Sequence, residues 1–115
     1  MKPPQTTFAK SHDTFTPMGS ELVTADAFGD PGNVDGSCHV NGVEMQAGNT
    51  HDMIFNCAYI LSYISRFATL EPDGVVATGT PAGVGHFRKP PVYLKPGDRV
   101  ACRVAGLGAL ENPVA

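Results

Sequence analysis

The chain has 115 residues, a formal net charge of −3 and 17% charged residues, while 42% of its residues are hydrophobic. This length allows one domain at most, and the apolar share is that of a globular protein rather than a disordered one. The absence of a Lys/Arg cluster argues against a nucleic-acid partner, no apolar run is long enough to cross a membrane, and the N-terminus lacks the apolar core of a signal peptide. We therefore expect a cytoplasmic protein.

Short strands separated by tight turns are the dominant expectation, because the chain carries 13 Gly and 10 Pro at turn-like positions. Residues 21–24 predict a short strand, and residues 26–33 are dense in turn formers and predict a loop. The clearest local signal is a β-hairpin, in which residues 34–40 and 43–46 flank Asn41-Gly42. Asn-Gly supplies the positive φ angles of a type I′ turn.

One long helix is predicted after the hairpin. Asn49 and Thr50 offer a cap, and Asp52 favours the positive end of a helix. Apolar residues then follow at helical spacing over about five turns, which indicates a helix packed on a sheet. This stripe consists of Met53, Ile54, Cys57, Ile60, Leu61, Ile64 and Phe67.

The last third of the chain returns to β-structure. Residues 75–77 predict a buried strand that enters a glycine-rich loop at 78–85, residues 94–98 predict a turn, and residues 99–104 alternate as a strand. The count is about five strands and one long helix. The predicted fold class is therefore mainly β with one long helix (α+β).

The cysteines point to no particular chemistry. Cys38, Cys57 and Cys102 are odd in number, widely spaced and set in apolar surroundings, without the spacing of a metal or redox pair. We expect three buried free thiols.

Two segments carry residues suited to chemistry. Glycines in the loop at 78–85 allow close backbone approach to a ligand beside two threonine hydroxyls, although composition alone favours an ordinary turn. Lys10, beside a His and an Asp, can anchor an anion or polarise a carbonyl, although a solvated surface lysine is the simpler interpretation. The acids form no E-x-E pair of the kind that holds Mg²⁺, so no metal ligand is predicted within the chain.

Taken together in order, these segments resemble the fumarylacetoacetate hydrolase superfamily over almost the whole chain, from about residue 5 to residue 113. The resemblance rests on KSHDTFTPMG at 10–19, LVTADAFGDP at 22–31, VNG at 40–42 with Gln46, NTHDMIF at 49–55, ATGTPAGVG at 77–85, YLKPGD at 93–98 and GLGAL at 106–110. The chain thus looks like a partial C-terminal domain of that family, spanning residues 1–115, and the implied fold is part of a mixed β-roll.

The resemblance implies an enzyme that hydrolyses, decarboxylates or isomerises acylpyruvates, other dicarbonyls or 2-oxo acids, usually as a dimer. Family members use Mg²⁺ or Mn²⁺ and cationic side chains to stabilise an enolate. Lys10 matches the family lysine beside metal and substrate, and Thr14 matches a residue of the same pocket. Thr80, with Gly79 and Pro81, matches the loop that bonds the substrate carboxylate or carbonyl.

The family's E-x-E pair and Asp-x-x-x-Arg-Asp segment, which supply the metal carboxylates, are absent, and so are the His and Glu that activate water. We expect either a fragment or a truncated gene product, whose partner is a second copy or the missing N-terminal half. One alternative is a catalytically inactive remnant that acts as a dimerisation or interaction module. Another is a small β-domain that binds a ligand without catalysis.

Overall fold

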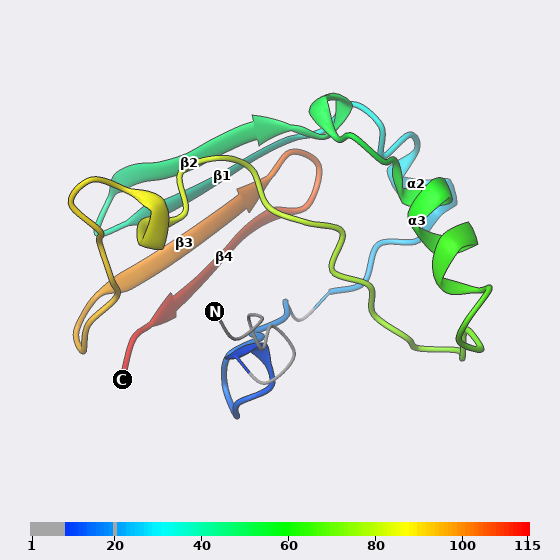
Figure 1. Cartoon of the computed structure of the whole chain (residues 1–115). Coiled ribbons are helices and arrows are strands. Elements are labelled where there is room, and N and C mark those ends of the chain that lie inside the picture. Colours follow the sequence, from blue (N-terminus) through cyan, green and yellow to red (C-terminus); the bar gives the residue numbers. More distant parts are fainter. Residues whose placement is uncertain (1–8, 20) are drawn as a thin grey trace.

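The structure is a computed structural model that describes residues 9–19 and 21–115. Its centre is a four-stranded antiparallel sheet in the order β2-β1-β3-β4 (Figure 1). The strands are β1 (Asp35–Val40), β2 (Val43–Asn49), β3 (Arg99–Val104) and β4 (Gly108–Pro113). The mainly β class is confirmed, whereas the wider mixed β-roll stays a prediction.

The predicted hairpin is confirmed, because β1 and β2 pair directly across Asn41 and Gly42. These two residues have φ angles of 52° and 81°, as a type I′ turn requires. The Asn41 side chain also reaches the start of β3: its Nδ2 donates to Asp98 Oδ1 at 2.9 Å, and its Oδ1 accepts from the Arg99 backbone N–H at 2.9 Å. One turn residue therefore fixes the hairpin against the next strand.

A β-bulge interrupts the β1–β2 ladder. Cys38 pairs with Gln46 and His39 pairs with Glu44, which leaves Met45 as the extra residue on β2. A bulge frees backbone groups from the ladder and bends the strand. The Met45 carbonyl is consequently available to a partner outside the sheet.

The predicted long helix is wrong in extent. From residue 21 on, the helical elements are α2 (Ala25–Phe28), η1 (Thr50–Asp52), α3 (Cys57–Ile64) and η2 (Gly85–Phe87). Asn49 does cap, but it accepts from the His51 N–H and begins only a 3₁₀ turn, and Asn56 accepts from the Tyr59 N–H to begin α3. Two successive caps break the apolar stripe into two short helices. No helix among the described residues has the length and apolar character needed to span a membrane.

Two predicted strands do not form, and one strand was not predicted. Residues 21–24 and 75–77 pair with no strand in the described part of the chain, and Val75 is 70% exposed rather than buried. The predicted loop at 26–33 includes most of α2. The predicted strand at 99–104 and the turn before it are confirmed, and β4, which was not predicted, pairs with β3. A short apolar run becomes a strand only where a neighbour accepts its hydrogen bonds.

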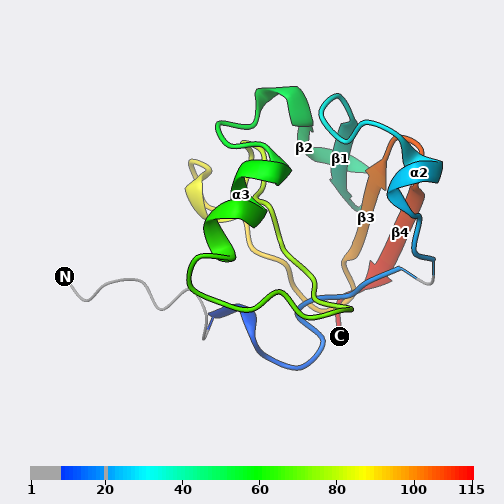
Figure 2. The ribbon, with the colours of Figure 1, turned by 90° about the vertical axis from the view of Figure 1, so that its right-hand side faces the viewer.

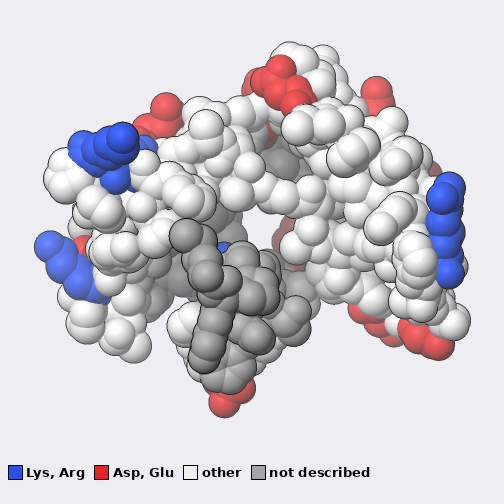
Figure 3. All heavy atoms as spheres, viewed as in Figure 1, with Lys and Arg blue, Asp and Glu red and all other residues white. Residues whose placement is uncertain are grey.

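The described residues contain no buried hydrophobic side chain, and their one buried polar residue is Asp98. Extensive contacts between elements join only neighbouring strands, so the expectation that the helix packs on the sheet is wrong. Figure 2 shows α3 standing apart from the sheet, and Figure 3 shows an opening through the molecule between the two. The fold therefore lacks a closed core of its own.

The expectation of three buried thiols is also wrong. Cys38 and Cys57 are half-buried and Cys102 is exposed, although all three are free thiols as predicted. Since β1 and β3 are adjacent, Cys38 and Cys102 lie opposite each other despite their separation in sequence.

Candidate functional site

The glycine-rich loop lies against the outer edge of the sheet, beside β2. Gln46, on β2, donates from Nε2 to Thr80 Oγ1 at 2.9 Å and to the Pro81 carbonyl at 2.8 Å. Gly48 faces the Pro81 ring so closely that a Cβ there would meet it at 2.9 Å. Thr80 and Pro81, both predicted site residues, are therefore fixed to the strand by one amide group.

Arg88 fixes the far end of the same loop. Its Nε donates to the Gly83 carbonyl at 3.0 Å, and its Nη2 donates to the carbonyl of Met45, the bulge residue. Charge-assisted bonds of this kind are roughly twice as strong as neutral ones. The half-buried guanidinium thus bridges loop and strand at the bulge.

Glycine is required at position 83 for two reasons. Its φ is +107°, which other residues rarely adopt, and a Cβ there would lie less than 3.0 Å from the Met45 carbonyl oxygen. Gly79, another predicted site residue, also has a positive φ of 134°, but no atom lies within 4 Å of its Cβ position. The loop therefore turns freely at residue 79 and packs tightly at residue 83.

The bonds of Thr80 determine what its hydroxyl can do. The oxygen accepts a hydrogen bond from Gln46, so the O–H remains able to donate to another group. Thr80 is exposed, and the neighbouring Gly79 has no side chain to cover it. The arrangement suits donation to an oxygen of a small anion or carbonyl.

The lysine segment is not joined to this loop in the described part of the chain. Lys10 and Thr14 are both exposed, and no hydrogen bond or ion pair within residues 9–19 and 21–115 connects either of them to the loop. Thr14 has a φ of 68°, an uncommon conformation for a threonine. The structure therefore brings Thr80, Gly79 and Pro81 together, and leaves Lys10 and Thr14 separate from them.

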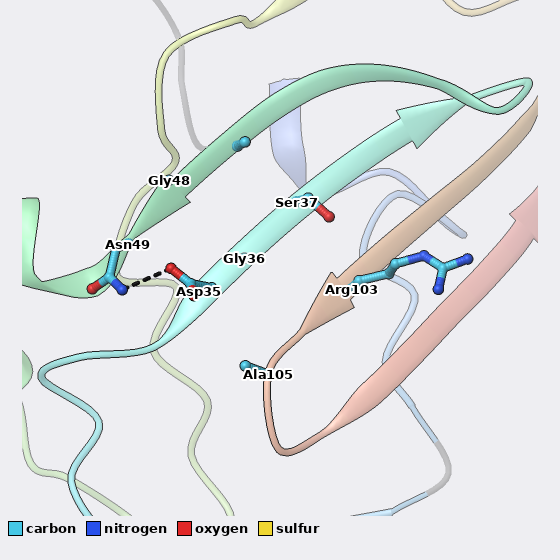
Figure 4. A pocket seen from close by; sticks show the side chains of 8 residues that line it. Asp35, Gly36, Ser37, Gly48, Asn49, Arg103 and Ala105 are labelled. Atoms are coloured by element: carbon cyan, nitrogen blue, oxygen red, sulfur yellow. Dashed lines mark hydrogen bonds between the residues drawn. The ribbon is translucent and has the colours of Figure 1, made fainter.

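A hollow of about 580 Å³ lies on the sheet and contains none of the predicted site residues. Figure 4 shows Ser37, Arg103 and the hydrogen-bonded pair Asn49–Asp35 at its border; the Asn49 Nδ2 donates to Asp35 Oδ1 at 2.8 Å. Side chains alternate across a strand, so Asn49 and Gln46 point to opposite faces of the sheet. The side chains at the border of the hollow therefore lie on the face opposite to Gln46, although Gly48, which faces Pro81, also lines the hollow.

Groups of three or more His, Cys, Asp or Glu side chains able to hold a metal ion do not occur among the described residues. A hard divalent cation needs several oxygen ligands at once. The side chains around the Thr80 loop, an amide, a hydroxyl and a guanidinium, do not fit such a cation.

Sequence reasoning did not assign a role to Gln46 or Arg88. Gln46 belongs to the segments that carry the family resemblance, and its place on a short alternating strand was the available signal. No sequence signal pointed to Arg88, because its bond to Met45 joins residues far apart in sequence and depends on the bulge.

Comparison with known proteins agrees with the resemblance. The family model described as "Fumarylacetoacetate (FAA) hydrolase C-terminal" matches residues 1–115. The mitochondrial oxaloacetate tautomerase FAHD2A of Bos taurus is 49% identical over 105 residues, which are 91% of this chain and 33% of that protein. The chain therefore spans about a third of the length of this curated relative.

Solved structures show the same relation. A fumarylacetoacetate hydrolase from the psychrophilic Exiguobacterium antarcticum has a TM-score of 0.87 and 50% identity, over 91% of this chain and 38% of that one. Maleylpyruvate hydrolase from Sphingobium sp. SYK-6, solved with manganese(II) and pyruvate, has a TM-score of 0.83 and 36% identity, over 94% and 38% of the two chains.

Proposed function

The chain belongs to the fumarylacetoacetate hydrolase family, and we propose that it forms the C-terminal part of an enzyme acting on acylpyruvates, other 1,3-dicarbonyls or 2-oxo acids. The proposed reaction is cleavage of a C–C bond by hydrolysis or decarboxylation, or isomerisation through an enol. The named relatives favour this substrate class: one is an oxaloacetate tautomerase, and another is a maleylpyruvate hydrolase solved with pyruvate.

The observation that carries the proposal is the fixation of Thr80 by Gln46. The amide holds both the Thr80 hydroxyl oxygen and the Pro81 carbonyl, so the direction of the remaining O–H is set before any ligand arrives. A donor that needs no reorganisation stabilises negative charge better than a free one. Thr80 then donates to the substrate carboxylate or carbonyl oxygen, while Gly79 leaves the approach open.

Lys10 and Thr14 have the second role in this proposal. A lysine ammonium beside the substrate stabilises the negative charge that develops on the enolate oxygen, and the Thr14 hydroxyl adds a donor to the same pocket. In the described structure these residues are exposed and apart from Thr80. The proposal therefore requires residues 10–14 to approach the loop in the complete protein.

A manganese-bound relative makes a divalent metal part of the proposal for the complete protein. The side chains described here do not provide its ligands, so no step in this chain depends on the metal. We further propose that the active form is a homodimer, or this segment completed by the rest of a family chain. The cytoplasmic location stays a prediction, since the bovine relative is named as mitochondrial.

The experiment uses the complete protein that carries this segment, with oxaloacetate tautomerisation and acylpyruvate hydrolysis as assays. Lys10→Met and Thr80→Val should each reduce kcat/KM by roughly a hundredfold, the scale of one lost preorganised charge-stabilising group. Lys89→Met and Thr69→Val are the matched controls, because both residues are exposed and lie outside the loop at 78–85. The control variants should keep normal turnover.

Two outcomes contradict the proposal. Unchanged turnover in Lys10→Met and Thr80→Val would make both residues ordinary surface residues. A complete protein that turns over no member of the panel would favour the inactive interaction module instead.

A further inference from the structure

Cys38 on β1 and Cys102 on β3 are directly opposite each other in the sheet. The Asn41 N–H donates to the Arg99 carbonyl, and the Ala105 N–H donates to the Asp35 carbonyl, so the odd-numbered residues of β1 form the hydrogen-bonded pairs with β3. Cys38 and Cys102 are therefore a non-hydrogen-bonded pair. In such pairs the Cα atoms are about 4.5 Å apart and the side chains lie closest together.

That spacing fits a disulfide. Bridged cysteines have Cα atoms roughly 4.4–6.8 Å apart, with Cβ atoms facing each other. The two side chains also point to the same face of the sheet, as the side chains of directly paired residues do. No backbone movement beyond a small adjustment is needed to join the sulfurs.

The neighbours of the pair in the same row of the sheet are uncharged. Across the sheet, Gln46 and Leu110 flank the two cysteines in the same row. Burial, and secondarily the neighbouring Cys102, raises the pKa of the Cys38 thiol to about 11. Cys38 is therefore protonated at neutral pH and half-buried, whereas Cys102 is exposed. The two thiols differ in access, which sets the order in which they react.

We propose that Cys38 and Cys102 form a thiol–disulfide exchange site that is oxidised by low-molecular-weight disulfides such as oxidised glutathione. The Cys102 thiolate attacks one sulfur of the small disulfide, forms a mixed disulfide and releases one small thiolate. Cys38 loses its proton and attacks Cys102 Sγ, which forms the Cys38–Cys102 bond and releases the second small thiolate. The two protons lost by the cysteines go to the two released thiolates, and the small disulfide is reduced as the protein is oxidised.

The bridge would cross-link the two central strands, whose cysteines are distant in sequence. Closing a long loop in the unfolded chain favours the folded state, so oxidation should stabilise the sheet. Cys57 lies on α3, away from the sheet, and takes no part in this reaction. The site does not depend on the proposed enzymatic function.

The test is oxidation of the 115-residue chain by oxidised glutathione, followed by intact mass, thiol titration and peptide mapping. The expected product has lost about 2 Da, retains one of its three thiols and yields a peptide that links residues 38 and 102. Its thermal midpoint should be higher than that of the reduced chain. A persistent glutathione adduct on Cys102, intermolecular disulfides as the main product, or a bridge to Cys57 would overturn the proposal.

Three controls separate native geometry from chance pairing. Cys57→Ser should leave the bridge unchanged, and Cys38→Ser should stop at the mixed disulfide on Cys102. In concentrated urea the pairing of Cys38 with Cys57 should replace the native bridge, because it closes a shorter loop. The same 38–102 bridge with equal yield in urea would show that the folded sheet does not direct it.

Discussion

The exposed surface of the isolated chain predicts that it associates when it is alone. Its accessible surface is 9731 Å², whereas a folded monomer of 12.1 kDa exposes about 6,000 Å². Roughly 3,700 Å² therefore remains that a closed fold of this mass would remove from water. Apolar side chains contribute to this surface around α3, with Ile54 at 91% and Phe67 at 76% exposure.

The size of this excess also distinguishes the possible partners. A standard dimer interface buries about 800 Å² on each partner, less than a quarter of the excess. A second copy alone therefore leaves most of the surface exposed, unless the interface is of the largest obligate kind. The remaining two-thirds of a family chain is the better match, and co-expression with that part of a relative should give one defined complex.

The perturbation is Phe67→Glu in the isolated chain, with Ser62→Glu as the control. Burying a phenylalanine side chain contributes about 2 kcal/mol, so its loss should weaken association roughly thirtyfold. The control adds the same charge to an exposed polar position on α3 and should change little. Sedimentation velocity at micromolar concentration measures the effect. A single 12.1 kDa species at that concentration would refute the reasoning.

Three further predictions concern the loop, the turn and the metal. Gly83→Ala should lower the free energy of unfolding in urea by about 2–4 kcal/mol, because its φ is strained and the new Cβ would clash with the Met45 carbonyl. Gly19→Ala is the control and should not lower it, because a Cβ at Gly19 would have no described atom within 4 Å. The hydrogen bond from Asn41 lowers the pKa of Asp98 below 3.8, so its stabilising effect is present above pH 3.8 and is lost as the pH falls below it. Asn41→Gly should flatten the fall of the thermal midpoint over that acid range. The isolated chain should bind Mn²⁺ only weakly, and micromolar binding by calorimetry would contradict this.

Elements fixed by neighbouring residues could be predicted from the sequence. The Asn41-Gly42 turn specifies its own geometry, and the strands on both sides follow from alternation. The strand at residues 75–77 could not be predicted correctly, because an apolar run does not reveal whether a partner strand lies beside it. The helix was overestimated for a related reason: the apolar stripe was visible, but the second cap at Asn56 was not recognised.

The site divides in the same way. The Thr80 loop was found through ordered motifs, but the bonds that fix it come from Gln46 and Arg88, which are distant in sequence. The pairing of Cys38 with Cys102 depends on the register between β1 and β3, which no local pattern specifies. For the fold and for the site alike, contacts between residues far apart in the sequence could not be predicted from local patterns.

The wrong predictions share one physical cause. The stripe at 53–67 and the runs at 21–24 and 75–77 are apolar segments that need cover, and in the described structure their residues are exposed or at most half-buried. The outer edge of β4 likewise presents backbone N–H and C=O groups that no described strand pairs, whereas beside β2, the other outer strand, the Gln46 side chain holds the loop that carries Thr80. The sequence is therefore consistent with a larger folded unit, and the sheet is the part of it that residues 35–113 can stabilise through their own hydrogen bonds. The side that carries α3 and the outer edge of β4 is then where the rest of that unit should bind.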